Sequence, residues 1–277
     1  MKITDQRIVV TGAAGGIGAA LCRKLADAGA QLLLVGRKPA ALAELTQSLK
    51  NTHPQTRTAC LALDITASDA PSRLRDEALA LLGGIDILVN NAGVPGFGAF
   101  AQTQPQEIEC LLATSLTAPL LLTRAVLPDL LARGQGGIVN IGSTFGAIGF
   151  PWFAAYSGAK FGLRGFSEAL RRELVGSGVV VLYAAPRATR TAINDDRVTA
   201  MGAATGMPFD EPDEVARRIV AAMLRGDAEC AIGAQESFFA RLNGLLPRLV
   251  DKGLAAQARV MAPFARRPAI DNPPTEI

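Results

Sequence analysis

Short apolar runs rich in leucine and β-branched residues alternate along the chain with longer segments of helical periodicity. We expect strands at Ile8–Val10, Gln31–Val35, Thr58–Leu63, Ile85–Val89, Gly137–Ile141, Val179–Ala184 and Glu229–Ile232. The first six runs are apolar almost throughout, which indicates strands covered on both faces. Strict alternation of strand and helix predicts an α/β fold, with a doubly wound parallel sheet of about seven strands and helices on both faces.

Amphipathic helices are expected between these strands, where apolar residues recur every three or four positions. Their stripes are Ile17, Leu21, Leu25 and Ala28, with Gly29 placed to end the helix, and then Leu42, Leu45 and Leu49. Further helices are predicted over Glu107–Arg133, Tyr156–Val175 and Asp213–Arg225. Pro119 should bend the first of these three, because proline lacks the backbone N–H that a helix needs.

The composition agrees with one large domain. The chain has 277 residues, 49% of them hydrophobic, and no linker-like stretch divides it. A net charge of +3 without a basic, aromatic-rich stripe argues against a nucleic-acid partner. We see no apolar run of about 18 residues and no signal-like N-terminus, so we expect neither a transmembrane helix nor secretion.

Cysteine and histidine usage argues against a metal site. The four cysteines are widely spaced and none forms a CxxC pair, which disfavours a zinc cluster or a disulfide framework. Reduced thiols fit a cytoplasmic protein. The only histidine, His53, lies in a polar stretch and is interpreted as a loop residue.

A glycine-rich turn follows the first predicted strand and opens the first predicted helix. Residues 11–18 read TGAAGGIG. In such a sheet ligands bind beyond the carboxyl ends of the strands, and the unpaired N–H groups of a helix N-terminus attract phosphate. Glycine leaves this backbone open to a ligand, although a tight turn that needs glycine only for its φ angles has the same pattern.

The second strand ends in LLLVGRK, where the adenosine ribose of a bound dinucleotide would lie. An acidic residue there would bind the free 2′-hydroxyl of NAD, whereas an arginine accommodates the 2′-phosphate of NADP. Arg37, with Lys38 beside it, therefore favours NADP(H); the alternative is an ordinary solvated basic loop.

Tyr156 and Lys160 lie four positions apart in a predicted helix and share one of its faces. A lysine cation favours the phenolate and lowers the pKa of a neighbouring tyrosine from its ordinary value of about 10. Such a tyrosine can give a proton to a carbonyl oxygen or take one from an alcohol. Ser143, at the end of the fifth predicted strand, can hydrogen-bond the same oxygen. Each of these residues also has a purely structural interpretation.

Ordered motifs between Arg7 and Ile232 make the chain resemble the short-chain dehydrogenase/reductase family. They are TGAAGGIG at Thr11–Gly18, the LDI that holds Asp64, NNAG at Asn90–Gly93, Ser143, and the Tyr-x-x-x-Lys pair Tyr156 and Lys160. The resemblance implies a single-domain Rossmann fold, hydride transfer between a nicotinamide and a carbonyl or alcohol carbon, and no metal. It also implies a homodimer or homotetramer.

The resemblance further implies a role for each matching residue. Ser143 would orient the substrate oxygen, Tyr156 would be the acid and base, and Lys160 would hold the nicotinamide ribose and lower the pKa of Tyr156. The cofactor contacts would be Gly12, Ala14, Gly15, Gly16, Ile17, Gly18, Arg37, Asp64, Ile65, Asn91, Ala92, Gly93, Tyr156, Lys160, Pro186 and Thr191.

Two positions depart from the family's usual pattern. Ser115 stands where an asparagine usually holds a water for proton relay, so we keep Ser115 as a catalytic candidate and expect a slower or rerouted relay. Arg187 follows Pro186 where glycine is usual. It would bind an acidic substrate group or a phosphate, or it would point to solvent.

Apolar segments after several strands predict a lipophilic carbonyl substrate, such as a ketoacyl chain or a polyketide-type ketone. They supply Phe97, Phe100, Phe145, Ile148, Phe150, Trp152 and Phe153, whose alternative role is to complete the core. The loop that carries Met201 and Met207 is interpreted as a mobile lid over the site.

Residues 236–277 extend beyond the family's usual end, so we divide the chain into a Rossmann-type domain, 1–235, and a C-terminal helical extension with a loose tail. Phe238, Leu242, Leu245 and Leu249 form one helical stripe, and Pro247 should kink the helix. This helix would pack on the body or on a neighbouring subunit, or would make weak contact with a membrane.

The leading interpretation is a cytoplasmic NADPH-dependent carbonyl reductase. Because cells usually keep NADPH reduced, Arg37 favours reduction as the working direction. The alternatives are an alcohol dehydrogenase that works in the oxidative direction and a non-catalytic NADP-binding sensor or scaffold.

Overall fold

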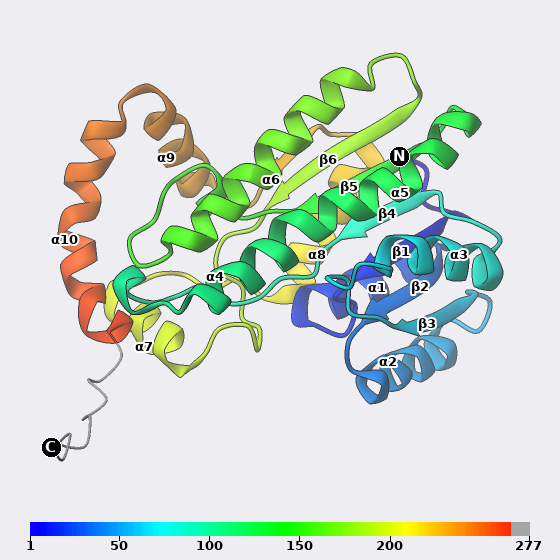
Figure 1. The fold of residues 1–277 in the computed structure, drawn as a ribbon, viewed down its shortest axis with the longest axis horizontal. Helices are drawn as coiled ribbons and strands as arrows, with labels where there is room; N and C mark the ends of the chain where they lie inside the picture. The colour runs from blue at the N-terminus through cyan, green and yellow to red at the C-terminus, as the bar shows by residue number, and fades with distance from the viewer. Residues whose placement is uncertain (267–277) are drawn as a thin grey trace, which may run out of the picture.

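In the computed structural model, which describes residues 1–266, seven parallel strands form one sheet in the order β3-β2-β1-β4-β5-β6-β7 (Figure 1). They are β1 (Arg7–Thr11), β2 (Gln31–Gly36), β3 (Thr58–Ala62), β4 (Ile87–Asn90), β5 (Gly136–Ile141), β6 (Val179–Ala185) and β7 (Glu229–Ala231). Every predicted strand is confirmed to within a few residues. The strand order reverses direction between β1 and β4, which is where such sheets bind ligands.

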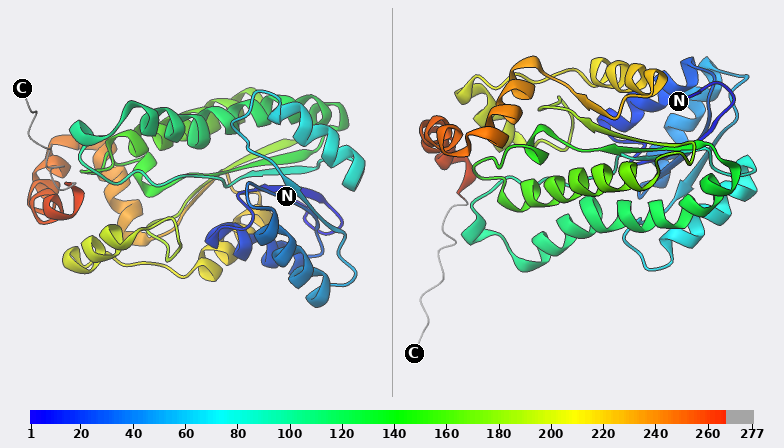
Figure 2. Two further views of the ribbon diagram at one scale, coloured as in Figure 1. Left: turned by 60° about the horizontal axis from the view of Figure 1, so that its bottom comes forward. Right: turned by 90° about the horizontal axis from the view of Figure 1, so that it is seen from above.

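Helices cover both faces of the sheet (Figure 2). One layer holds α1 (Gly16–Asp27), α2 (Pro39–Thr52) and α8 (Pro212–Arg225), and the other holds α3 (Ala70–Leu82), α5 (Ala118–Arg133) and α6 (Ala154–Glu173). Alternation along β1 explains the two layers, because Ile8 and Val10 join the first core and Val9 the second, all fully buried. The predicted α/β fold with helices on both faces is confirmed.

The longest helical run differs in detail from its prediction. It consists of α4 (Pro105–Leu112), a π-helical turn η2 (Ala113–Thr117) and α5. The distortion therefore precedes Pro119, which lies in the first turn of α5. A proline ring clashes with the carbonyl four residues earlier, here that of Ser115, and the wider π turn relieves this clash.

By length and composition alone, the run Pro105–Arg133 could cross a membrane, with a mean hydropathy of 1.6 over its best window. Core helices of other proteins pass the same test, and here Leu122, Val126 and Leu130 are buried against the sheet. The run is therefore weak support for a membrane span.

Two helices lie where none was predicted. One is α3, and the other is α7 (Asp196–Thr205), so the expectation of a loop there is wrong. The Asp195 side chain caps α7 by accepting a hydrogen bond from Val198 N, and Met201 is fully buried beneath the helix. The chain also contains two short 3-10 turns, η1 (Phe100–Gln102) and η3 (Thr144–Gly146).

The C-terminal extension is two helices, α9 (Ala234–Leu245) and α10 (Pro247–Ala265). The expected kink at Pro247 is a full break, because the backbone of Leu246 is not helical. The break leaves the predicted stripe exposed, with Leu245 79% and Leu249 54% accessible, whereas α10 buries a different set of residues, Val250, Met261 and Ala265.

Several hydrogen bonds join the extension to the body, which confirms packing on the body. Trp152 Nε1 donates to Ala258 O at 2.9 Å, Ala99 N to Ala265 O at 3.0 Å, and Asn243 Nδ2 to Ala147 O at 3.0 Å. Nothing found supports the predicted membrane contact. The division into 1–235 and 236–277 stays a prediction, and the predicted loose tail falls mostly outside the described residues.

Candidate active site

The glycine turn joins β1 to α1, and packing explains two of its four glycines. Gly12 has φ +64°, and a Cβ there would lie 2.8 Å from Ala92 Cα. A Cβ on Gly18 would overlap the Gly12 carbonyl oxygen. Asn91 fixes the turn, since its Nδ2 donates to Thr11 O at 3.0 Å and Gly12 O at 3.1 Å. The turn-geometry interpretation therefore holds for these two positions.

The remaining glycines face the ligand side of the turn. Gly15 is the N-cap of α1, no side-chain hydrogen bond caps this end, and Ala14, Gly15 and Gly16 are exposed. Thr191 lies against the turn, because a Cβ on Gly16 would come within 2.5 Å of its Cγ2. An exposed, uncapped helix N-terminus with a hydroxyl beside it fits the pyrophosphate of a dinucleotide.

The predicted adenosine contacts lie at the carboxyl ends of β2 and β3. Arg37 is exposed just after β2, and Asp64 is exposed after β3, followed by buried Ile65. The pKa of the Asp64 carboxyl is lowered, chiefly by hydrogen bonds from the backbone and hydroxyl of Thr66 and also by the charge of Arg37. Arg37 and Asp64 thus follow neighbouring strands at the same edge of the sheet.

Ser143 follows β5 and is held from below by a residue that the sequence analysis missed. Tyr183, buried in β6, accepts a hydrogen bond from Ser143 N at 3.3 Å and donates one to Ser143 O at 3.2 Å. Side chains on Gly142 or Gly146 would overlap the phenol of Tyr183, so the turn closes around it. Its only signal in the sequence is a hydroxyl inside an otherwise apolar strand.

Tyr156 and Lys160 project from the first turns of α6. Burial raises the pKa of the Tyr156 phenol, while a hydrogen bond with Ser143 lowers it. Lys160 Nζ donates to Ile141 O at 3.0 Å and lies 5.7 Å from the centre of the Tyr156 ring. Desolvation lowers the pKa of Lys160 to about 8. The pKa of Tyr156 is thus raised in this structure, whereas Lys160 was expected to lower it; Lys160 is not among the groups that shift this pKa.

One cavity brings these groups together. Its lining includes the predicted site residues Ile17, Asn91, Gly93, Ser143, Tyr156, Lys160, Pro186 and Thr191. Its apolar wall is formed by Phe97, Phe145, Phe153, Val198, Met201 and Met207. Several predicted wall residues do not line it: Phe100 is 59% exposed, and Ile148, Phe150 and Trp152 pack outside the cavity.

Ser115 lies in the π-helical turn and is 1% exposed. Its hydroxyl has no hydrogen-bond partner and lies 4.0 Å from the position of a Cβ on Gly93, a residue that lines the cavity. A buried hydroxyl without a partner is costly, so a water or ligand atom would be bound there. Ser115 itself does not line the cavity, which places it behind the wall.

Arg187 is neither free nor solvent-facing. It lines the cavity, and its guanidinium pairs with Asp210 and Glu236, so the expectation that it points to solvent is wrong. The alternative that it binds an acidic substrate group or a phosphate stays a prediction. Its partners lie 23 and 49 positions away, where no sequence signal connects them.

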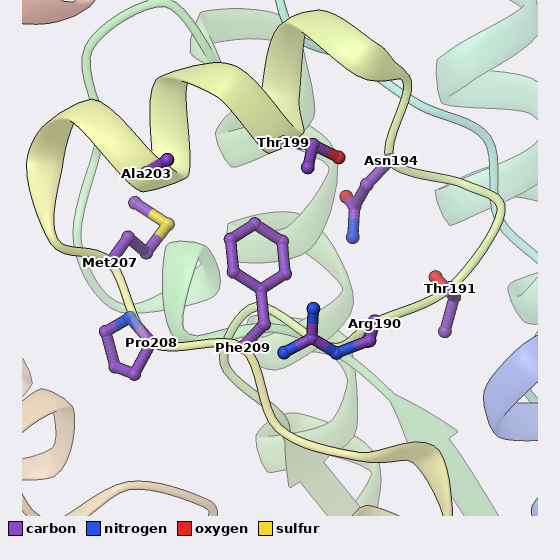
Figure 3. Close-up of a pocket in the computed structure, with 8 residues that line it drawn as sticks. All are labelled: Arg190, Thr191, Asn194, Thr199, Ala203, Met207, Pro208 and Phe209. Carbon is purple, nitrogen blue, oxygen red and sulfur yellow. The ribbon is translucent and has the colours of Figure 1, made fainter.

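A second pocket opens beneath α7 and shares Thr191, Asn194 and Met207 with the cavity. Figure 3 shows the Phe209 ring beneath the helix, between Met207 and Arg190. Gly202 permits this packing, because a side chain there would overlap the ring.

Within residues 1–266, no cluster of His, Cys, Asp and Glu is arranged to hold a metal ion.

Comparison with known proteins gives the relatives of this chain. Residues 6–202 match the family model described as short chain dehydrogenase. Dehydrogenase/reductase SDR family member 7B of Bos taurus is 32% identical over 264 residues, which span 91% of this chain and 81% of that protein. Ketoacyl reductase HetN of Nostoc sp. (strain PCC 7120) is 33% identical over 232 residues, which span 83% and 79%.

A solved structure is similar over nearly the same length. The short-chain dehydrogenase from Sphingobium yanoikuyae in complex with NADPH has a TM-score of 0.76 at 30% identity, covering 89% of this chain and 95% of that one.

Proposed function

This chain belongs to the short-chain dehydrogenase family, and from that premise we propose that it is a cytoplasmic, NADPH-dependent reductase of a lipophilic ketone. Membership makes it an oxidoreductase that acts on a small molecule with a nicotinamide cofactor. The observation that carries the finer proposal is the single cavity that holds Ser143, Tyr156 and Lys160 against an apolar wall.

The residues present fit an NADP(H) molecule. The exposed end of α1 at Gly15 and Gly16, with Thr191 beside it, would hold the pyrophosphate, and Arg37 would pair with the 2′-phosphate. When bound, the nicotinamide supplies a hydride to the substrate carbon. The likeness to a structure that contains NADPH supports the choice of cofactor.

Tyr156 is suited to give a proton to a carbonyl oxygen. Because burial raises the pKa of its phenol, the hydroxyl stays protonated at neutral pH. Ser143 hydrogen-bonds that phenol and lines the same cavity, so both hydroxyls can reach one substrate oxygen. The oxidative direction would need the phenolate, which burial disfavours.

Lys160 supplies the positive charge of the site. Its ammonium is almost fully buried and is anchored on Ile141 O beneath the Tyr156 ring. From there it would hold the nicotinamide ribose and stabilise the charge that develops as Tyr156 releases its proton.

The apolar wall supports a lipophilic substrate. Phe97 and Phe153 contact each other with their ring centres 5.0 Å apart and their planes tilted by 38°, and Met201 and Met207 complete the wall from the side of α7. Thioether and aromatic side chains adapt to apolar ligands of different shapes. Similarity to a protein named as a ketoacyl reductase supports a ketoacyl chain or a polyketide-type ketone.

A panel of ketones and acyl thioesters, followed by loss of NADPH absorbance, tests the proposal. We expect kcat/KM to rise with the apolar surface of the ketone. Turnover confined to small hydrophilic ketones would exclude the lipophilic substrate. Faster oxidation of alcohols with NADP would favour the dehydrogenase alternative, and NADP binding without turnover in either direction would favour a sensor or scaffold.

We also propose self-association as a homodimer or homotetramer. Leu112, Leu121 and Leu131 on the run Pro105–Arg133 and Phe161 on α6 are all at least 36% exposed, which supports a shared apolar interface. Light scattering of the purified chain decides this, since a monomeric mass at micromolar concentration would exclude it.

Arg37 provides the sharpest test of the cofactor. Replacing it with Asp removes the charge that would pair with the 2′-phosphate, so the preference for NADPH over NADH should fall by about tenfold or more. Lys38→Ala, one position away, is the matched control and should change the preference less. An unchanged preference in Arg37→Asp would remove Arg37 from the cofactor site.

A further inference from the structure

We propose that this site selects ketones that carry no charge near the carbonyl and rejects the corresponding keto acids, because Asp210 and Glu236 neutralise Arg187 in the cavity wall. The inference rests on the proposed function and names the substrate class of the same site. Among the described residues that line the wall, Arg187 is the one arginine, so its state decides whether a carboxylate finds a partner.

Each nitrogen of the guanidinium is engaged. Nε donates to Asp210 Oδ2 at 2.9 Å and Nη2 donates to Asp210 Oδ1 at 2.7 Å, a planar two-point pair. Nη1 donates to Glu236 Oε1 at 3.3 Å. The fork of Nε and Nη2, which recognises carboxylates, is therefore already filled by Asp210, and Glu236 takes a third of the five N–H donors.

The charge balance around Arg187 is unfavourable for a further anion. One guanidinium faces two carboxylates, and the second oxygen of Glu236 is buried without a hydrogen-bond partner. The three side chains are only 26%, 15% and 22% exposed, so solvent screens the surplus negative charge weakly. A substrate carboxylate brought to this wall would meet repulsion instead of a salt bridge.

The other cation of the cavity is also occupied. Lys160 donates to Ile141 O and lies beneath the Tyr156 ring, where the nicotinamide ribose would sit. It serves the reacting end of the site and is 4% exposed, so it does not replace Arg187 as a partner for a substrate acid.

The clamp on Arg187 is built into the backbone. Arg190 N donates to Asp210 O and Asp210 N to Ala188 O, both at 2.9 Å, which holds the segment before α8 against the segment after β6. On the other side, a Cβ on Gly233 would overlap the Glu236 carboxylate and would lie 3.2 Å from Arg187 Cδ. The space is therefore shaped for this ion pair.

Glu236 gives the C-terminal extension a part in selectivity. It lies in the first turn of α9, the helix that begins beyond the part of the chain matched by the family model. The extension thus brings the second carboxylate to a wall that also carries Pro186 and Thr189.

Matched pairs of neutral and acidic ketones test this selectivity. Ethyl benzoylformate and benzoylformate share one keto-acyl group and differ by the ethyl group and the charge, as do ethyl levulinate and levulinate, and both acids are ionised at neutral pH. With the full chain and saturating NADPH, kcat/KM for each ester should exceed that for its acid by about 100-fold. Equal values for ester and acid would overturn the inference.

Replacing the two carboxylates by uncharged amides of nearly the same size should leave the charge of Arg187 free to bind a substrate acid. In the double variant Asp210→Asn, Glu236→Gln, the ester-to-acid ratio should fall by about tenfold or more, through a lower KM for the acids. Adding Arg187→Leu should abolish that gain, because the unmasked guanidinium is then gone. An unchanged ratio in the double variant would overturn the inference.

A neighbouring acid provides the matched control. Glu211 is next to Asp210 but pairs with Arg190 at the surface, where both side chains are about two-thirds exposed. Glu211→Gln removes the same charge and should leave the ester-to-acid ratio unchanged. If it shifts the ratio as much as the double variant does, general surface charge rather than the clamp on Arg187 controls selectivity.

Two further measurements keep the outcome decisive. Thermal unfolding shows whether the double variant folds; if it does not, Glu236→Gln alone, which keeps the two-point pair with Asp210, should still lower the ratio about threefold. If the wild-type chain reduces none of the ketones, the proposed function fails. Equilibrium binding of ester and acid to the NADPH-bound protein then decides the selectivity separately.

Discussion

The reacting groups and the cover above them are held in place by different forces. Ser143 and Lys160 are fixed by hydrogen bonds to buried backbone and to the phenol of Tyr183 inside the sheet. The cover, which we define as α7, α9 and α10, is held by the ion pairs of Arg187, by a few hydrogen bonds to loops, and by one apolar cluster. The reacting groups are therefore anchored on the buried sheet.

Substrate selectivity depends on the cover, whose contacts with the body can be altered by few substitutions. The apolar cluster joins Phe97 and Phe153 from the body to Met201 of α7 and Met261 of α10. Trp152 connects the same parts, with a φ of +66° that a tryptophan rarely adopts, an indole N–H on Ala258 O, and a carbonyl that accepts from Gly98 N. Substitutions in the cover should act on KM and stability, and those beneath the site on kcat.

The largest effect should come from Tyr156→Phe. Loss of the acid should lower kcat by about 10²–10⁴-fold. The affinity for NADPH and the thermal unfolding temperature should change little, because the ring and its packing remain. Turnover within a few fold of the wild type would show that another group supplies the proton. Tyr156 would then not belong to the reacting groups that we contrast with the cover.

The second-largest effect should be the pH dependence of the reductive kcat/KM, which we expect to follow the charge of Lys160. Its pKa is lowered to about 8, so the ammonium is present below that pH and is lost above it, whereas the raised pKa of Tyr156 keeps its phenol protonated. Reductive kcat/KM should be flat near neutral pH and then fall about tenfold per unit above pH 8. In Lys160→Arg the rate should be lower, but the decline of kcat/KM above pH 8 should vanish. If the decline persists in this variant, a group other than Lys160 causes it.

Tyr183→Phe should have a smaller effect that still belongs to the reacting side. Removing the hydroxyl takes a partner from both Ser143 N and Ser143 O, which frees the turn that carries the Ser143 hydroxyl. We expect kcat to fall by about five- to tenfold with KM nearly unchanged. Thr46→Val is the control, because it removes another buried hydroxyl, which is bonded to Leu42 O in α2 and has no contact with Ser143. Equal losses of kcat in the two variants would show that Tyr183 contributes only to the general stability of the fold.

The smallest effect should come from the cover. Trp152→Phe removes the hydrogen bond to Ala258 O and should lower the free energy of unfolding by about 1 kcal/mol. KM for apolar ketones should rise by about two- to threefold, with kcat retained. A loss of kcat as large as that of Tyr183→Phe would mean that the cover and the reacting groups are not separate.

The sheet and most of its helices could be predicted from the sequence because their signals are local. A strand buried on both faces is a continuous apolar run, as Ile8–Val10 and Val179–Ala184 show. Helix α3 was missed although Leu74, Ala78 and Leu82 recur every four positions and are buried. Helix α7 has a weaker pattern, since small residues dominate it and packing against α10 stabilises it.

The reacting residues could be predicted because their spacing is short and specific, as in Tyr156 and Lys160. The clamp on Arg187 could not, because Asp210 and Glu236 reach it only through the folding of α8 and α9 around the sheet edge. The raised pKa of Tyr156 was also beyond the sequence, since it depends on how deeply neighbouring rings bury the phenol.

Transfer of deuterium from the nicotinamide to a ketone tests the central claim most directly. The wild-type chain is incubated with NADPH deuterated at the nicotinamide C4 and an aryl ketone, and the product alcohol is analysed by mass spectrometry. One of the two prochiral C4 positions of the cofactor should deliver deuterium to the carbinol carbon, and Tyr156→Phe should bind the cofactor but form almost no labelled alcohol. Tight NADPH binding with no deuterium in any product, or labelled alcohol formed equally well by Tyr156→Phe, would contradict the account.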